Sequence, residues 1–210
     1  MTKSYKSIYK KPDFFSNLAK KSHYRSRSSL KLIEVKVTNN AEDLCLATHI
    51  ILPGQGAFAS CMNGLKNIPG MIDELSENIL IQKKPFLGIC VGMQLLANVG
   101  YENGSHTGLG WVNGEIRKIV QKNLKLPHMG RNEVVIKKEN DLIKEKNNHN
   151  YYFVHSYYFE CKSHENKIAT TDYGLNFASV VSKENIYGVQ FHPEKSSTNG
   201  LKLLKNFINL

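Results

Sequence analysis

A cysteine between two glycines is the feature whose residue types and spacing point most directly to chemistry. Residues 88–92 read G-I-C-V-G, after the apolar run P-F-L-G-I and before a helix-like stretch. Glycines on both sides of a nucleophile permit the tight strand-to-helix turn that exposes its side chain. At such a turn the Cys90 sulfur lies at the N-terminus of the next helix, where the helix dipole favours the thiolate. The pentapeptide therefore predicts a nucleophilic cysteine, with a buried structural cysteine as the alternative.

A histidine and a glutamate two positions apart form the second candidate. The segment Q-F-H-P-E-K-S places His192 and Glu194 on either side of Pro193. Proline favours extended backbone for the residue before it, and positions i and i+2 of extended backbone face the same way. Glu194 would then hold the imidazole tautomer whose other nitrogen takes the cysteine proton. A turn is the alternative for an isolated H-P-E, but together with Cys90 the segment predicts a catalytic triad.

A glycine-rich turn after a predicted strand is the third candidate. Residues 53–58 read P-G-Q-G-A-F, and their glycines allow backbone N–H groups to approach a ligand. Such a turn would add a second oxyanion donor to the Val91 N–H, which directly follows the nucleophile. An ordinary strand-to-helix turn is the alternative. The run is not G-x-G-x-x-G, so it gives no case for a dinucleotide.

The elements that must position these residues follow an α/β pattern. Apolar runs at 47–52 and 85–89 predict strands, the second apolar on both faces like a buried parallel strand. Helical spacing predicts helices over residues 71–81 and 91–99, and a last helix over about 200–208. Together these elements predict a mixed, mostly parallel sheet with helices on both faces. Further predicted strands cover residues 32–37, 115–120, 132–137, 151–155, 167–171, 178–182 and 186–191.

Length and charge limit the domain organisation. A chain of 210 residues with 41% hydrophobic content is long enough for one sizeable core. Residues 1–36 hold ten of the 28 basic and two of the 18 acidic residues, so the remainder is close to neutral. We therefore predict a basic, disordered segment over residues 1–31, rather than an arm for nucleic acid, and one domain over residues 32–210.

Cysteine and histidine spacing limits the setting and the cofactors. The chain has neither an apolar run long enough to span a membrane nor the pattern of a secretory signal. Its four cysteines form no C-x-x-C pair, and its eight histidines show no metal-ligand spacing. We therefore expect no membrane partner, no metal and no cofactor, and we expect the protein in the reducing cytoplasm.

Taken together, the motifs resemble those of the class I glutamine amidotransferases. The matching segments are P-G-Q-G-A-F, G-I-C-V-G-M-Q-L-L, G-L-G-W, P-H-M-G-x-N, Y-F-V-H-S-Y, A-T-T-D-Y-G and G-V-Q-F-H-P-E-K-S. Within this class, H-P-E-K-S, P-H-M-G and Y-F-V-H-S-Y are most similar to the glutaminase subunits of imidazole glycerol phosphate synthases. The resemblance extends from about residue 32 to the end and implies a flavodoxin-like α/β fold.

The resemblance implies a glutaminase reaction through a cysteine thioester. Cys90 would attack the side-chain amide of L-glutamine, His192 would move the protons, and Glu194 would orient the histidine. The implied oxyanion donors are the backbone N–H groups of Val91 and of Gln55 or Gly56. The implied glutamine-binding positions are Gly54, Gln94, Glu102, His155, Ser156 and Tyr157.

The resemblance also implies a partner. The family passes ammonia to a β/α-barrel cyclase subunit, which would form a heterodimer with this chain and act in histidine biosynthesis. Two segments depart from the family pattern. The family's apolar first strand has no counterpart, and only Asn17 and Leu18 resemble the turn that follows it. Arg131 replaces a tryptophan in P-H-M-G-W-N. These departures predict poorer folding and poorer docking.

Three other functions remain open at the level of sequence. The same glutaminase chemistry would also suit a sugar-amidating enzyme of surface polysaccharide synthesis, and neighbouring genes would separate the two. A non-catalytic partner-binding subunit is the second alternative, although every expected catalytic residue is present. A free cysteine peptidase or hydrolase is disfavoured by Gln94 and by H-S-Y at residues 155–157.

Overall fold

The computed structural model describes residues 33–121, 124–144 and 150–210. The predicted basic segment, residues 1–31, lies outside the described residues. Contacts divide the chain into two units, Met1–Asn39 and Asn40–Leu210. In the first unit, residues 33–39 form neither helix nor strand, so the strand predicted over residues 32–37 is wrong in its described part. Alternating apolar and charged residues make a strand only where a neighbour completes the ladder, and no described ladder includes this segment.

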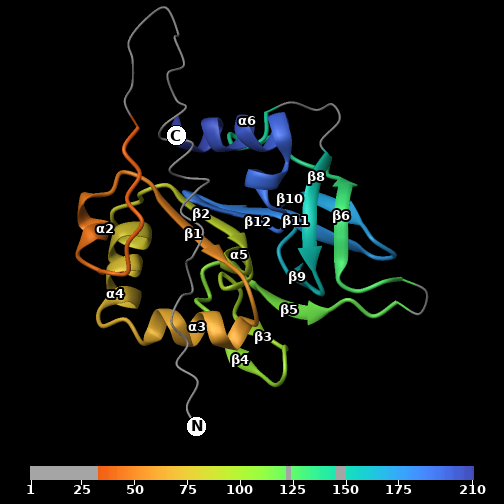
Figure 1. Cartoon of the computed structure of the whole chain (residues 1–210), viewed down its shortest axis with the longest axis horizontal. Helices are drawn as coiled ribbons and strands as arrows, with labels where there is room; N and C mark the ends of the chain where they lie inside the picture. The colour runs from red at the N-terminus through yellow and green to blue at the C-terminus, as the bar shows by residue number, and fades with distance from the viewer. Residues whose placement is uncertain (1–32, 122–123, 145–149) are drawn as a thin grey trace, which may run out of the picture. The chain divides into compact units, whose positions relative to one another are not determined.

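Three parallel strands in the unit Asn40–Leu210 carry the candidate nucleophile (Figure 1). Strand β2 (Phe86–Cys90) lies between β1 (Ile50–Gly54) and β12 (Ile186–Val189) and pairs in parallel with both. Every residue of β2 is buried, because a strand flanks it on either side and helix α5 (Val91–Gln94) packs against it. The buried parallel strand predicted over residues 85–89 is confirmed.

The rest of the ten-stranded sheet is largely antiparallel. The strand order is β1-β2-β12-β11-β9-β5-β3-β4, while β10 pairs with β11 and with β7. Among the described strands, only β3 and β5 add a parallel pair to those of β2. The remaining bounds are β3 (Val99–Gly100), β4 (His106–Thr107), β5 (Gly114–Lys118), β7 (Val135–Ile136), β9 (Tyr157–Cys161), β10 (Lys167–Asp172) and β11 (Asn176–Lys183).

The predicted mixed sheet is confirmed, but the prediction that it is mostly parallel is wrong. Antiparallel pairs outnumber parallel pairs among the described strands. Strands β10, β11 and β12 follow one another through short turns, and a short turn can join only antiparallel neighbours. Parallel pairing needs a crossover such as helices α3 (Phe58–Lys66) and α4 (Met71–Ser76), which separate β1 from β2.

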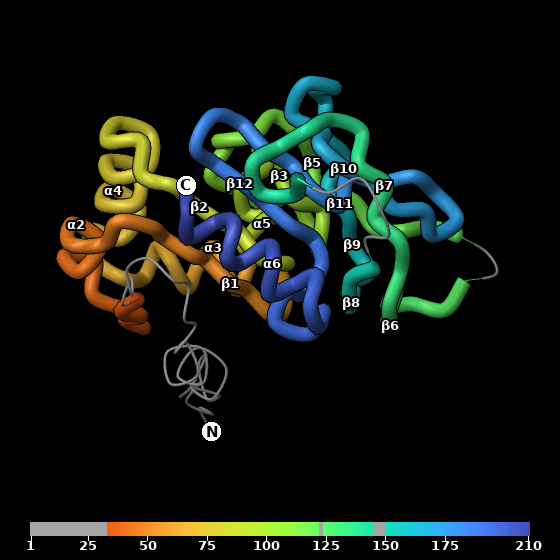
Figure 2. The backbone as a smooth tube through the Cα atoms, turned by 90° about the horizontal axis from the view of Figure 1, so that it is seen from above, coloured from red at the N-terminus to blue at the C-terminus, as the bar shows by residue number. Residues whose placement is uncertain are grey.

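A second, two-stranded sheet consists of β6 (His128–Glu133) and β8 (Asn150–His155). Figures 1 and 2 place it at the opposite end of the unit Asn40–Leu210 from helices α2 (Asp43–Leu46) and α4 (Met71–Ser76). The predicted strand over residues 132–137 is divided between β6 and β7. The segment that follows β12 and contains His192 reaches this small sheet through a bridge to Tyr152, so both sheets hold the segment in place.

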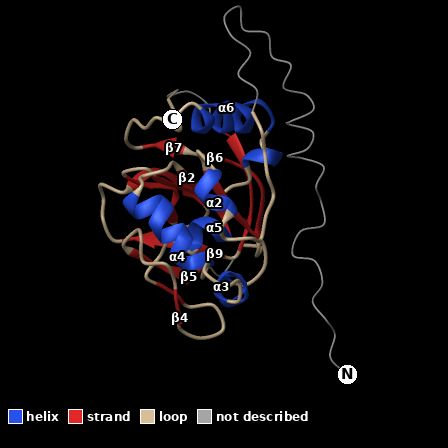
Figure 3. Cartoon of the chain, turned by 90° about the vertical axis from the view of Figure 1, so that its left-hand side faces the viewer, coloured by secondary structure: helices blue, strands red, loops and turns tan. Residues whose placement is uncertain are grey.

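Helices lie on both sides of the large sheet, as predicted. Figure 3 shows α6 (Ser197–Ile208) on one side of the strands and α3 (Phe58–Lys66) on the other. The helix predicted over residues 71–81 is α4 followed by one π-helical turn, Glu77–Ile81. A short 3₁₀ helix, Pro193–Lys195, precedes α6.

The helix predicted over residues 91–99 ends early, at Gln94. Its later carbonyls accept hydrogen bonds from the loop that contains G-L-G-W instead of continuing the helix. Leu95 O accepts from Leu109 N at 2.8 Å, and Leu96 O accepts from Val112 N at 3.0 Å. These bonds join residues that are far apart in the sequence, so helical periodicity alone could not reveal them.

Two glycines permit the tight turn between β2 and α5. A Cβ atom on Gly92 would lie 1.8 Å from the carbonyl oxygen of Leu52 in β1, and one on Gly88 would lie 2.6 Å from the carbonyl oxygen of Gly92. Both distances are too short for a carbon and an oxygen that are not bonded. The glycines on either side of Cys90 are therefore required by the packing of α5 against β1 and β2.

We predict that Gly92→Ala destabilises the chain by about 3 kcal/mol, because the added methyl group overlaps the Leu52 carbonyl. Urea denaturation followed by circular dichroism measures this change. Asn63→Ala, on an exposed position of α3, is the control and should change the free energy of unfolding by no more than about 0.5 kcal/mol. Equal denaturation midpoints for Gly92→Ala and the wild type would refute the packing argument.

Candidate active site

Cys90 lies at the junction of β2 and α5 in a conformation that residues with side chains rarely adopt. Its backbone dihedrals are φ 55° and ψ −112°. A positive φ at a non-glycine residue is strained and persists only where the surroundings impose it. The side chain is buried, and all four cysteines of the chain are free thiols. The geometry therefore has the strained strand-to-helix turn of a nucleophile elbow.

The register of the parallel strands determines the neighbours of Cys90. Gly54, at the end of β1, is the ladder partner of Cys90. On the other side Val189 of β12 pairs with Ile89, so the next residue, Gln190, comes beside Cys90. Gln190 is fully buried, and its Nε2 lies 3.7 Å from the Cys90 sulfur. The carboxyl ends of three parallel strands thus converge on the thiol.

His192 lies where the chain passes from the large sheet to the small one. The N–H of Gln190 still donates to Ser179 O of β11 at 3.0 Å, whereas the N–H of His192 donates to Tyr152 O of β8 at 2.8 Å. Ser196 closes this segment, because its hydroxyl donates to His192 O and accepts from the N–H of Tyr152. Each sheet therefore fixes one end of the segment between Gln190 and His192.

The predicted pairing of His192 with Glu194 is present in the geometry. His192 Nδ1 lies 2.7 Å from Glu194 Oε1, and the histidine is almost completely buried. Its other nitrogen, Nε2, is buried and makes no hydrogen bond within the described part of the chain. A carboxylate on Nδ1 holds that nitrogen as the N–H donor, so Nε2 is the atom available to exchange protons.

Burial and neighbouring charges act in opposite directions on this pair. Burial lowers the pKa of His192, but the adjacent Cys90 and Glu194 side chains outweigh it and raise the pKa from 6.5 to about 9. Burial raises the pKa of Glu194, but the hydrogen bond and the charge of His192 outweigh it and lower the pKa. His192 therefore carries a proton at neutral pH and is paired with an ionised glutamate.

A buried hydrogen-bonded chain of two histidines lies beside this centre. His155 Nδ1 donates to Tyr157 O at 2.8 Å, so its Nε2 is the acceptor for His128 Nδ1, 3.0 Å away. His128 Nε2 accepts in turn from Asn132 Nδ2 at 3.2 Å. Burial lowers the pKa of His128 to about 4 and is the main cause that lowers the pKa of His155 to about 3. Both rings are therefore neutral at neutral pH, each as a single tautomer.

The predicted glutamine-binding positions Gln94 and Tyr157 are in contact with each other. Gln94 Nε2 donates to Tyr157 O at 3.1 Å and to Gln190 Oε1 at 3.0 Å. His155 donates to the same Tyr157 carbonyl, and the Ser156 carbonyl accepts from Ile119 N at 2.9 Å. The structure thus brings Gln94, His155, Ser156 and Tyr157 together with Gln190 and Cys90.

Glu102 and the glycine-rich turn meet at the start of α3. Glu102 Oε2 accepts from the N–H of Phe58, the first residue of α3, at 2.7 Å. A carboxylate at this point satisfies a free N–H group of the first helical turn, and its negative charge interacts favourably with the helix dipole. Glu102 therefore holds the end of the turn that was predicted to supply an oxyanion donor. This capping contact was not expected from the sequence.

The predicted oxyanion donors lie on two segments that pack together. Val91 is the first residue of α5, and a Cβ atom on Gly54 would lie 2.8 Å from the backbone nitrogen of Gly92. Gln55 and Gly56 are exposed, and Gly56 has φ 104°, which favours glycine. Both segments adjoin Cys90, and the N–H donors themselves remain predictions.

Sequence reasoning missed Gln190, His128 and Asn132 as members of the centre. Gln190 stands two positions before His192, in the same motif that suggested the His192–Glu194 pair. Residues i and i+2 of a strand face the same way, so the same rule could have included Gln190. The contacts of His128 and Asn132 depend on the pairing of β6 with β8, which spacing alone does not reveal.

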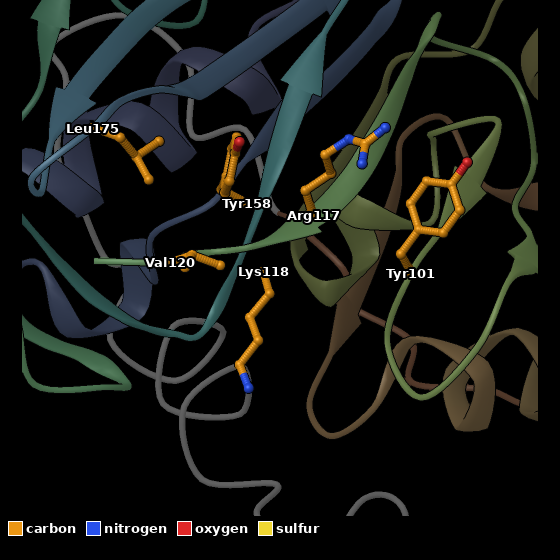
Figure 4. Close-up of a pocket in the computed structure, with 6 residues that line it drawn as sticks. All are labelled: Tyr101, Arg117, Lys118, Val120, Tyr158 and Leu175. Carbon is orange, nitrogen blue, oxygen red and sulfur yellow. The ribbon is translucent and has the colours of Figure 1, made fainter. Parts of the chain in front are cut away.

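A surface hollow of about 390 Å³ contains none of the predicted site residues (Figure 4). Its one arginine, Arg117, is already engaged, since it pairs with Glu115 and Glu160 and lies over the ring of Tyr101. The hollow is lined by Tyr101, Arg117, Lys118, Val120, Tyr158 and Leu175.

Within the described ranges no group of three or more His, Cys, Asp and Glu side chains could hold a metal ion. No described helix is long and apolar enough to cross a membrane.

We predict that Glu194→Gln destabilises the chain by about 2 kcal/mol between pH 4.5 and 6.5, because a charge-assisted hydrogen bond to His192 is lost. Below pH 4.5 protonation of Glu194 removes the effect. A raised histidine pKa gives stability that is complete below 6.5 and is lost as the pH rises through about 9, so the difference should shrink there. Urea denaturation across this pH range measures it.

Glu184→Gln is the matched control for this pH series. It removes an exposed ion pair with Lys83, whose contribution is small and does not depend on a histidine. Its effect on the free energy of unfolding should therefore show no decline between pH 6.5 and 9. A Glu194→Gln effect that is constant over the same interval would contradict the raised pKa of His192.

Comparisons with known proteins identify the family of this chain. The family model for glutamine amidotransferase class-I matches residues 12–210, a match that begins inside the predicted basic segment. The imidazole glycerol phosphate synthase subunit HisH of Pelagibacter ubique (strain HTCC1062) is 45% identical over 181 residues, which cover 85% of this chain and 87% of the relative. Imidazole glycerol phosphate synthase subunit HisH 1 of Campylobacter jejuni (strain RM1221) is 47% identical over 176 residues, which cover 83% and 87%.

Solved structures support the same fold. A crystal structure of a glutamine amidotransferase superposes with a TM-score of 0.65 at 17% identity, covering 84% of this chain and 86% of the other. Its low identity makes it evidence for the fold alone. The family match over most of the sequence, together with relatives more than 40% identical, shows that this chain belongs to the class I glutamine amidotransferase family, whose members are enzymes.

Proposed function

We propose that this chain is the glutaminase subunit of an imidazole glycerol phosphate synthase and that Cys90, His192 and Glu194 are its catalytic residues. The observation that carries the proposal is a buried histidine with a carboxylate on Nδ1, beside a cysteine on a strained elbow whose side chain helps to raise the histidine pKa. The relatives named as synthase subunits favour this acceptor pathway over an amidated sugar. The reaction converts glutamine and water to glutamate and ammonia.

In the first half-reaction the ionised Cys90 sulfur attacks the side-chain carbonyl carbon of glutamine. The carbonyl π electrons move to oxygen, and the N–H groups of Val91 and of the Gln55–Gly56 turn stabilise this oxyanion. The tetrahedral intermediate collapses as the C–N bond breaks, and His192 gives its Nε2 proton to the departing nitrogen. The products of this step are ammonia and a glutamyl thioester on Cys90.

In the second half-reaction the same histidine works in the opposite direction. His192 is now neutral and takes a proton from a water molecule, which attacks the thioester carbon. The second oxyanion collapses as the C–S bond breaks, which restores the thiolate beside the protonated histidine. The released γ-carboxyl group gives its proton to solvent and leaves as glutamate. Glu194 stays ionised throughout and stabilises His192 whenever it is charged.

Gln94, Glu102 and the backbone at residues 155–157 are the proposed glutamine-binding positions. Gln94 uses both hydrogens of Nε2 within the chain, on Tyr157 O and Gln190 Oε1. It would therefore bind glutamine through Oε1, as the acceptor for an N–H group of the substrate. Glu102 would contribute negative charge near the substrate amino group while it caps α3. Gly54 would allow the substrate to approach the backbone of β1.

The proposed partner is a β/α-barrel cyclase subunit that receives the ammonia in a heterodimer. Ammonia must stay uncharged to be transferred, and a closed path between two subunits keeps it from water. Arg131 in β6 is exposed, and its guanidinium donates to the hydroxyl of Ser197 at the start of α6. Four free thiols fit the reducing cytoplasm, which we propose as the location of the protein.

We predict that Cys90→Ser lowers the glutaminase rate about a thousandfold or more, because a serine hydroxyl is far less readily ionised than a thiol. The experiment measures glutamate release by the full chain with and without the barrel subunit. Synthesis driven by added ammonia should persist in the Cys90→Ser complex, which acts as the internal control for folding and docking. Glutamate release at the wild-type rate would rule out Cys90 as the nucleophile.

We predict that Arg131→Trp strengthens binding of the barrel subunit about tenfold, because a large aromatic side chain is a typical interface anchor, whereas a cation must lose water to enter an interface. Titration calorimetry measures the dissociation constant. Lys66→Trp, which replaces a cation in α3, is the matched control and should leave the constant unchanged. Equal affinities for the wild type and Arg131→Trp would place residue 131 outside the interface.

A further inference from the structure

Gln190 is buried beside the Cys90 sulfur, yet the glutaminase mechanism above gives it no role. No atom of its side chain is exposed, and its Nε2 lies at hydrogen-bonding distance, 3.7 Å, from the sulfur. A buried amide is costly unless its donors and acceptor are used. The orientation of this amide decides whether it offers the sulfur a hydrogen or a lone pair, so it bears directly on the charge of the thiol.

A backbone carbonyl settles the orientation of two amides in series. Tyr157 O can only accept, so the Gln94 atom 3.1 Å from it must be the nitrogen. That same nitrogen lies 3.0 Å from the end of the Gln190 side chain, so the Gln190 atom facing it must be the oxygen. The Gln190 atom that faces the sulfur is then the nitrogen. Reversing either amide would set two acceptors or two donors against each other.

The Tyr157 carbonyl, from which the orientation of both amides follows, is also held by a second donor. His155 Nδ1 donates to the same Tyr157 carbonyl at 2.8 Å, and His155 in turn accepts from His128. Both rings stay neutral at neutral pH because burial lowers their pKa values. The Tyr157 carbonyl therefore stays in place and accepts from both His155 and Gln94. The orientations of the Gln94 and Gln190 amides do not reverse near neutral pH.

The backbone of Gln190 is also held in place. Its N–H donates to Ser179 O of β11, and it directly follows Val189, the last residue of β12, which pairs with Ile89. The side chain thus reaches the sulfur from a fixed strand position, with its far oxygen bound to Gln94. An N–H donor that is oriented before any substrate arrives stabilises an anion more than water does, because it needs no reorganisation.

We propose that Gln190 is a further residue of the catalytic centre, whose amide N–H binds the ionised sulfur of Cys90 and is oriented by Gln94 and the Tyr157 carbonyl. This inference rests on the proposed function, in which Cys90 is the nucleophile. The sulfur then has two stabilising neighbours, the charge of His192 and the dipole of Gln190. The amide remains in place when His192 loses its proton to ammonia.

The test is the pH dependence with which Cys90 reacts with iodoacetamide, in the full chain without glutamine or a partner. The thiolate is the reacting form, so the rate reports its fraction. Gln190→Met removes the donor at similar length, and Gln190→Asn keeps an amide but shortens its reach. Peptide mass spectrometry separates Cys90 from the three other free cysteines. His192 and Cys61, two titratable groups of the described part that interact with Cys90, are unchanged in both variants.

We expect both variants to react about tenfold more slowly at neutral pH, as loss of a hydrogen bond to a charged atom requires, with the midpoint of the profile moved to higher pH. Ser179→Ala is the matched control: it removes a buried hydroxyl next to Gln190 but keeps the carbonyl that holds it, and its profile should match the wild type. A role in packing alone would lower the melting temperature without moving the profile.

Unchanged or lowered midpoints in the folded Gln190 variants would overturn the inference. Melting curves identify a variant that fails to fold, and the other variant then decides. The reaction with iodoacetamide needs no glutaminase turnover, so this result is separate from the test of the proposed function. An active Cys90→Ser would overturn the function, whereas normal profiles beside an inactive Cys90→Ser would overturn only the role of Gln190.

Discussion

The close approach of α5 to β1 is the constraint on which the rest of the site depends. Gly92 leaves no room for a side chain against the Leu52 carbonyl, and this contact forces the chain to turn at Cys90 with a positive φ. The turn aims the sulfur at the carboxyl edge of three parallel strands. The register of the parallel strands then places Gly54 on one side of Cys90 and Gln190 on the other.

Histidines of similar burial are driven to opposite charge states in this domain. His192 has a carboxylate on one nitrogen and a thiol near the other, and its pKa rises to about 9. His155 hydrogen-bonds to a backbone carbonyl and to a neutral histidine ring, with no carboxylate named among the causes that act on it, and its pKa falls to about 3. Burial lowers the pKa in both cases, so the neighbouring side chains decide the result. One histidine is thereby suited to proton transfer and the other to holding a fixed hydrogen-bond direction.

The chemistry-bearing motifs could be predicted from sequence because their geometry is local. The glycines on both sides of Cys90 describe a backbone turn of a few residues, which the structure contains. The H-P-E spacing correctly predicted the contact between His192 and Glu194, but the predicted extended backbone is wrong, since Glu194 lies in the 3₁₀ helix Pro193–Lys195. The balance of parallel and antiparallel strands could not be predicted in the same way. It depends on which strands become neighbours, as does the early end of α5, where Leu95 and Leu96 bond to a distant loop.

The role of Glu102 illustrates a second limit of sequence reasoning. Its family resemblance suggested a substrate contact, but a side chain can also have a structural partner that no motif reports. In the structure its carboxylate binds the N–H of Phe58 and holds the start of α3. Gln190 is the converse case, since it stood inside a recognised motif, and only the strand register showed that it touches the sulfur.

The central claim is that glutamine is cleaved through a covalent bond to the Cys90 sulfur. The most direct measurement is acid quenching of the chain during turnover with isotopically labelled glutamine, followed by digestion and mass spectrometry of the peptides. We expect a labelled glutamyl group on the peptide that contains Cys90, joined through sulfur, and its disappearance after brief treatment with hydroxylamine, which cleaves thioesters. Labelled glutamate released at the full rate with no adduct on that peptide, or with the adduct on another cysteine, would contradict the account.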